Sequence, residues 1–187
     1  IFSKRLKNIP REINFMRFIL KPLSFIPALI MMYIIFSFSA QNGTASSKLS
    51  YKVSHKIIAS ADHVLDLQLS DQQISRCIRK IHYYIRKCAH FTEYFLLAIS
   101  ISIPLYVYGI RGIWLVITAS ILCTGFAALD EFHQLFVEGR AGSLKDVLID
   151  SCGSLTGIIF VRIFGYIGRK TIIEPLYQRL GTEQNNL

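Results

Sequence analysis

Residues 92–130 read TEYFLLAISISIPLYVYGIRGIWLVITASILCTGFAALD. The runs 92–109 and 113–130 are almost wholly apolar, and each is long enough to cross the roughly 30 Å hydrocarbon core of a bilayer as an α-helix. The GIRG turn between them is so short that it predicts two antiparallel neighbouring helices. Because lipid offers the backbone no hydrogen-bond partners, this stretch predicts an all-α membrane protein.

A third apolar run lies near the amino terminus. Residues 23–40 (LSFIPALIMMYIIFSFSA) hold no charged residue and have the length of a transmembrane helix. A cleaved signal peptide is the alternative, with Ser37 and Ser39 as the small residues near a cleavage point. Its apolar core would be unusually long for a signal peptide, so we predict a retained span.

The fourth span is predicted at about 145–165. Ser143 and Asp146 have the spacing of a capping box, which satisfies free amides at a helix start. Gly153 and Gly157 have a small-xxx-small spacing that permits close helix contact, and packing within the bundle is favoured over dimerisation. The chain, 1–187, is therefore expected to be a single polytopic domain with four transmembrane helices.

Composition supports this class. Hydrophobic residues make up 52% of the chain, charged residues 18%, and the mean hydropathy is +0.40. The net charge of +9 could indicate nucleic-acid binding, but the basic residues flank apolar runs, which is typical of membrane anchoring. No CxxC motif occurs, so the four cysteines are expected to be unpaired thiols.

The segment 43–90 is polar but patterned. Apolar residues recur at helical spacing in 51–67 and again in 71–86, and Ser70 with Gln73 forms a capping box before the second stretch. The sequence therefore predicts one or two amphipathic helices in the first loop. They could lie on the membrane surface or pack on the bundle, and both alternatives stay open at this stage.

The orientation follows from charge. Lys and Arg are almost evenly divided between the two sides, but six precede the first span and only three follow it closely. Because the first helix usually dominates, we expect a cytoplasmic amino terminus, with 41–90 and 130–146 outside.

Polar residues gather at one predicted face of the membrane. Four antiparallel spans place the start of the second, the end of the third and the start of the fourth on the same side. Ionisable residues at membrane depth are costly, which makes them candidates for function. The charged and histidine members of this set are Arg86, His90, Glu93, Asp130, Glu131, His133, Arg140, Asp146 and Asp150.

These residues also carry a resemblance. The strings RKCAHFTEYFLLA (86–98) and DEFHQLFVEGRAGSLKDVLIDSCGSLTG (130–157) resemble the two signature regions of the VanZ-like family. The string FSFSAQ (36–41) resembles that family's first motif, a serine and a glutamine that close the first helix. The resemblance implies a bacterial inner-membrane protein related to teicoplanin resistance, and it implies no settled reaction.

Candidate roles follow from side-chain chemistry. A histidine oriented by a carboxylate could act as a general base, and arginine or lysine suits a phosphate or carboxylate. Histidine with carboxylates could also bind zinc, manganese or iron, but no HExxH motif occurs and structural hydrogen bonding is favoured, so no metal is predicted and the sequence names no cofactor. The catalytic candidates are His90, Glu93, Asp130, Glu131 and His133. The candidates for substrate binding are Gln41, Arg86, Lys87, Tyr94, Gln134, Arg140, Asp146 and Asp150.

Three functions remain open on the sequence. The first is binding or handling of an amphiphilic envelope molecule, a membrane lipid or lipid-linked precursor, in a polar pocket at the outer face. The second is a membrane-embedded hydrolase or transferase that acts on a lipid-linked or phosphate-bearing substrate. The third is a structural or regulatory partner of envelope proteins, in which the polar residues only close the fold.

Overall fold

The computed structural model describes residues 21–173, and within this range the chain is helical with no strand. Four stretches have the length and composition of membrane spans: Lys21–Ser39, Asp71–Val107, Ile113–Gln134 and Leu144–Thr171. They contain the helices α2 (Ile26–Ser39), α4 (Asp71–Val107), α5 (Ile113–Gln134) and α6 (Leu144–Gly168), and a π-helical turn η2 (Arg169–Ile173) follows α6. The all-α membrane architecture with four spans is confirmed.

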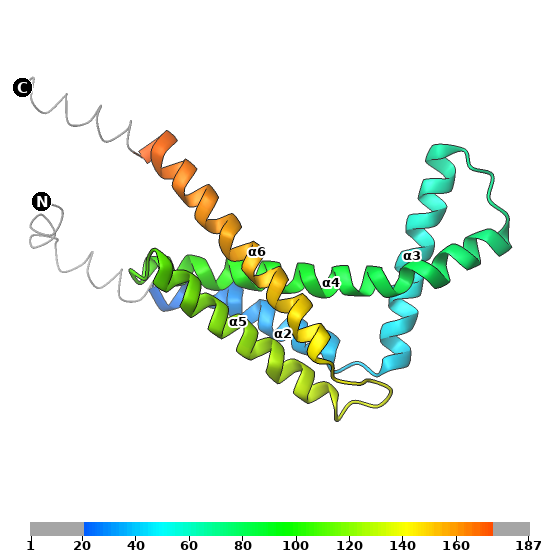
Figure 1. The fold of residues 1–187 in the computed structure, drawn as a ribbon, viewed down its shortest axis with the longest axis horizontal. Coiled ribbons are helices and arrows are strands. Elements are labelled where there is room, and N and C mark those ends of the chain that lie inside the picture. Colours follow the sequence, from blue (N-terminus) through cyan, green and yellow to red (C-terminus); the bar gives the residue numbers. More distant parts are fainter. Residues whose placement is uncertain (1–20, 174–187) are drawn as a thin grey trace, which may run out of the picture.

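The spans alternate in direction, so the ends of the described range and the connections divide between two ends of the bundle. Figure 1 shows α2 running alongside the second half of α4, with α6 crossing α4 diagonally and α5 sloping the same way as α6 without crossing it. The 109–112 turn lies near the start of α2, where the rings of Phe25 and Tyr108 are 5.7 Å apart. The 135–143 loop lies at the opposite end, beside the end of α2.

Small residues let the helices approach closely. Ala98 on α4 and Ala119 and Cys123 on α5 are completely buried in the core. A Cβ added to Gly153 or Gly157 on α6 would clash with backbone carbonyl oxygens of α4, so both glycines sit directly against that helix. The small-xxx-small pair therefore serves packing within the bundle, as the sequence favoured.

Large apolar side chains cover the outside of the bundle. On α5, Trp114, Ile121 and Leu129 are about two-thirds exposed, at 68%, 66% and 66%. Such a surface would be costly in water, and lipid removes that cost because acyl chains are as apolar as these side chains.

The first loop differs from the prediction in two ways. A separate helix, α3 (Gly43–Leu65), begins eight residues earlier than the expected 51–67 stretch. The expected helix 71–86 and the expected span 92–109 are one continuous helix of 37 residues, α4. The prediction separated them because residues 86–93 are polar, but those residues interrupt the apolar pattern without breaking the helix.

The two predicted helix caps also have different outcomes. The capping box of Ser70 and Gln73 is present at the start of α4, with both reciprocal hydrogen bonds. The box predicted for Ser143 and Asp146 is wrong. Ser143 does cap α6, but its hydroxyl accepts from the amide of Lys145, and the Asp146 carboxylate pairs with Lys87 on α4 instead. A strong cationic partner on a neighbouring helix outcompetes the local backbone amide.

Candidate functional site

The candidate site lies at the end of the bundle where α2 and α5 end, α6 begins and α4 passes through. The buried face of α5 explains its position. Ala119, Cys123 and Ala127 line that face inside the bundle, and Asp130, Glu131 and Gln134 continue it for one further turn. The same helix face therefore changes from small and apolar to acidic as it reaches the end of the bundle.

The floor of the site is a layer of buried polar side chains. Tyr94 and Asp150 are 0% exposed, Asp130 and Gln134 are 3% exposed, and Glu131 is 5% exposed. These five residues come from α4, α5 and α6, so the three helices meet at this level. Buried polar groups in proteins are normally hydrogen-bonded, which makes their partners informative.

Only some atoms of the floor have partners. The Gln134 amide donates to Asp130 over 3.2 Å, and the backbone amide of Ser143 donates to Glu131 over 2.8 Å. Several other buried atoms make no hydrogen bond within residues 21–173: the Tyr94 hydroxyl, the second oxygen of Asp130 and of Glu131, and both oxygens of Asp150. The floor thus offers more hydrogen-bonding capacity than the described residues use.

The rim of the site is mostly buried and is mainly cationic or imidazole. Lys87 forms an ion pair with Asp146, which joins α4 to α6. His90 Nδ1 lies 3.8 Å from a carboxylate oxygen of Glu93, one turn further along α4. The His133 ring stacks at a tilt on Phe36 with the ring centroids 4.6 Å apart, so the end of α2 contacts the end of α5.

Arg140 joins the 135–143 loop to α2. Its Nε donates to the carbonyl oxygen of Gln41 over 2.9 Å, and Nη2 donates to that of Phe38 over 2.7 Å. The guanidinium thereby satisfies carbonyl groups that the end of a helix leaves free. Among the described residues Arg140 forms no ion pair with an acid of α5 or α6, and its hydrogen bonds go to the carbonyls of Gln41 and Phe38.

Arg86 is the cation in this region without a partner. No hydrogen bond or ion pair joins it to another described residue, although it is half-buried. Burial lowers the pKa of Arg140, and the positive charge of Arg86 is the next largest cause. Both guanidiniums remain protonated at any physiological pH, so two like charges approach each other here.

His90 lies among these cations. Arg86, Lys87 and Arg140 all act electrostatically on it, and Asp146 is the acid that does so. Glu93 in turn interacts with Asp130 and with Arg140. The structure thus brings together α4 residues, the end of α5 and the loop before α6, which the sequence placed on one side.

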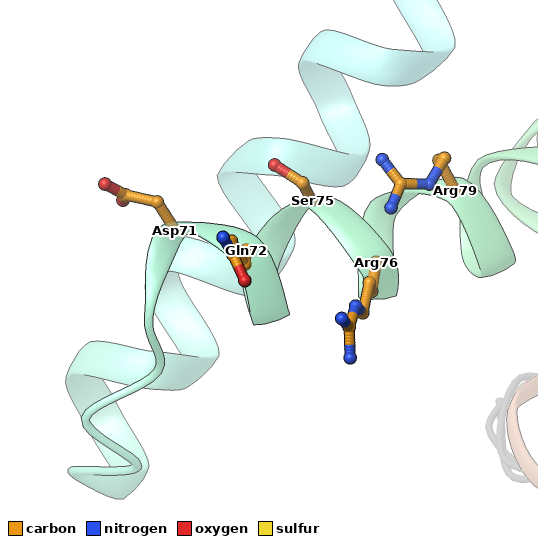
Figure 2. Close-up of a pocket in the computed structure, with 5 residues that line it drawn as sticks. All are labelled: Asp71, Gln72, Ser75, Arg76 and Arg79. Atoms are coloured by element: carbon orange, nitrogen blue, oxygen red, sulfur yellow. The ribbon is translucent and has the colours of Figure 1, made fainter.

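Two open depressions of the described chain lie away from this cluster. An open depression of about 410 Å³ lies elsewhere, on the first turns of α4, and Figure 2 shows that its lining residues Asp71, Gln72, Ser75, Arg76 and Arg79 all come from that one helix. A second depression of about 440 Å³ lies on α3. Across residues 21–173, His, Cys, Asp and Glu side chains form no group of three or more arranged to hold a metal ion.

The three regions that build the site all lie within the stretch that identifies the chain. A family profile described as VanZ/LLP1 matches residues 24–165, which covers the four spans and the loops between them. The chain belongs to the VanZ/LLP1 family. No curated protein and no solved structure matches it.

Some members of this VanZ/LLP1 site were missed by reasoning from the sequence. Ser39, Ser102 and Ser154 are buried, and the hydroxyls of Ser39 and Ser102 have no partner among the described residues. Ser39 stands inside the FSFSAQ motif, so the motif was the available signal. Gln41, a substrate-binding candidate from the sequence, contributes its backbone carbonyl as an acceptor for Arg140.

Proposed function

We propose that the protein binds an amphiphilic cell-envelope molecule, with its anionic headgroup at the rim of the polar cluster and its acyl chains in the surrounding bilayer. A membrane phospholipid and a lipid-linked envelope precursor share this chemistry. The protein would reside in the bacterial inner membrane with its amino terminus in the cytoplasm, so the cluster would face the outer side.

The observation that carries the proposal is the unpaired Arg86 beside Arg140. Two guanidiniums that approach each other repel, and an anion between them removes that repulsion. Phosphate and carboxylate are the anions that guanidinium groups bind best, through paired hydrogen bonds. Both arginines lie at the end of the bundle where α2 and α5 end and α6 begins, which matches the depth of a lipid headgroup.

The floor of the cluster supports the same proposal. Asp130, Glu131 and Asp150 each keep at least one buried oxygen without a partner in residues 21–173. Carboxylate oxygens accept hydrogen bonds from hydroxyl groups, which glycerol and sugar headgroups supply in number. A headgroup with a phosphate and several hydroxyls therefore suits both layers of the site.

A membrane-embedded hydrolase or transferase is the second candidate. The close pair of His90 and Glu93 favours it, because a carboxylate beside an imidazole can orient a general base. Arg86 would then hold a phosphate-bearing leaving group. In a hydrolase the attacking group would be water, and in a transferase it would be a hydroxyl group of the acceptor, with His90 taking the proton in either case.

Lipid co-purification of an Arg86→Gln variant tests the proposal. We expect the full-length variant, extracted in mild detergent, to lose at least about tenfold of its bound phosphate-bearing lipid, because a charge-assisted hydrogen bond contributes about 1.5–3 kcal/mol. Arg111→Gln is the matched control, since Arg111 lies in the exposed turn at the other end of the bundle. Lipid mass spectrometry of both preparations gives the readout.

Other outcomes would separate the competing functions. A variant with unchanged bound lipid and a lower melting temperature would contradict the proposal and favour a purely structural network. Chemical conversion of the bound lipid by the original protein, abolished by His90→Gln or His133→Gln, would favour the enzyme.

A further inference from the structure

Helix α3 has a face that nothing in the described chain covers. One side of the helix packs on α4 through Ser54 and Ile58, which are 0% and 8% exposed. Leu49, Val53, Ile57 and Val64 line a different side and are 48%, 39%, 50% and 77% exposed. Their spacing of four, four and seven residues places them on one continuous stripe.

A row of lysines borders this apolar stripe. Lys48, Lys52 and Lys56 recur every four residues and are all exposed. The hairpin formed by residues 43–87 carries eight Lys and Arg against three Asp, and the acids Asp62, Asp66 and Asp71 all lie at its tip. The body of the hairpin is therefore basic where its apolar stripe lies.

The place of α3 in the fold puts this face near the lipid headgroups. Three residues separate the end of α2 from the start of α3, and the amide of Gly43 donates to the carbonyl of Glu138 in the 135–143 loop. Figure 1 shows α3 lying across α4 rather than along it. Because α4 spans the bilayer, a helix that crosses it at the end of the bundle runs along the plane of the membrane.

We propose that α3 lies on the bilayer as an interfacial helix, with its Leu49–Val64 stripe inserted among the upper acyl chains and its lysine row against anionic lipid phosphates. An amphipathic helix with lysines beside its apolar stripe binds a membrane surface through both the buried apolar area and the attraction to anionic lipid. The lysine row distinguishes an anionic lipid surface from a second copy of this basic chain, which would repel it. This proposal is independent of the proposed headgroup site.

Tryptophan quenching in reconstituted vesicles tests this position. The chain contains one tryptophan, Trp114, so Trp114→Phe gives a background into which Ile57→Trp is introduced. We expect phosphatidylcholine vesicles with phosphatidylglycerol and brominated acyl chains to quench Ile57→Trp at least twofold more than the matched variant His55→Trp. His55 is exposed and lies about 200° around the helix from Ile57, on the other side of α3.

The charge contribution has its own measurement. Replacing Lys48, Lys52 and Lys56 together by Gln should reduce quenching of Ile57→Trp in the vesicles that contain phosphatidylglycerol. Circular dichroism and gel filtration of each variant confirm that the fold is kept. Equal quenching at both tryptophan positions, or a blue-shifted Ile57→Trp that brominated lipid does not quench, would overturn the proposal, the latter because protein rather than lipid would then cover the face.

Discussion

At the scale of single residues, the candidate site depends on glycines at close helix contacts as much as on charged side chains. Gly142 lies against the carbonyl of Glu131, Gly153 against that of Phe91, and Gly157 against that of Phe95. These contacts bring helices α4, α5 and α6 close enough for the buried acids of the site to share one layer. The glycines are therefore part of the site's construction even though they carry no functional group.

Alanine substitution tests this role. Gly153→Ala should lower the free energy of unfolding by about 1–3 kcal/mol, because the added methyl group meets backbone rather than a flexible side chain. Gly165→Ala is the matched control on the same helix, where an added Cβ meets nothing within 4 Å. Thermal unfolding in detergent should show a lower midpoint for the first variant only. Equal midpoints would mean that α6 can move away from α4 without loss.

The pair of Lys87 and Asp146 allows a second test at this scale. Both side chains are mostly buried, at 16% and 18% exposed, and they connect α4 to α6 beside the candidate site. A double-mutant cycle with Lys87→Met and Asp146→Asn should give a coupling free energy of about 1 kcal/mol, measured by unfolding in detergent. A coupling near zero would show that the two charges are solvated independently.

At the scale of elements, α4 connects the two parts of the molecule. Its 37 residues extend over roughly 55 Å, almost twice the hydrocarbon thickness of a bilayer. The second half carries the core and site residues, and the first half pairs with α3 around Ile78, which is 1% exposed. A rigid helix therefore links the basic hairpin to the polar cluster.

Ile78→Asp should detach this hairpin. A carboxylate at a buried apolar contact is strongly unfavourable, so amides of α3 should exchange faster by hydrogen–deuterium exchange while those of α5 and α6 keep their protection. Cys77→Asp supplies the control, since it adds the same charge at the exposed neighbouring position. Unchanged exchange in α3 would show that the α3–α4 contact contributes little to the hairpin.

At the scale of the whole molecule, the alternation of four spans assembles the site. Three segments that are far apart in the sequence, at 36–41, 86–98 and 130–146, reach the same end of the bundle. The hairpin 43–87 leaves that end and returns to it, and α4 and α5 then run away from it and back again. The termini of the described range and the 109–112 turn lie at the other end. The direction in which the protein is inserted therefore decides which side of the membrane the polar cluster faces.

Labelling with a membrane-impermeant thiol reagent checks the orientation. In a background lacking the exposed thiols Cys77, Cys88 and Cys152, we expect Thr44→Cys and Ala141→Cys to react from outside and Arg111→Cys to react only after permeabilisation. Thr44 and Ala141 are exposed, whereas the neighbouring Gly142 is packed against backbone. The reverse pattern would place the polar cluster on the cytoplasmic side.

The sequence by itself determined the helix class, the four spans and the end of the bundle at which the polar residues meet. These follow from length, hydropathy and the alternation of direction, which are properties of the chain in a bilayer and need no knowledge of partners. The spacing of Ser70 and Gln73 likewise predicted a cap correctly, because both groups lie within one helical turn.

Only the tertiary structure decided which polar groups pair. Arg140 binds the carbonyls at the end of α2, about a hundred residues earlier in the chain. Asp146 pairs with Lys87 and does not complete the predicted capping box. That Arg86 has no partner among the described residues can be seen only once the partners of Arg140 and Asp146 are known. A charged side chain takes the strongest partner within reach, and reach is set by packing between helices rather than by spacing along the sequence.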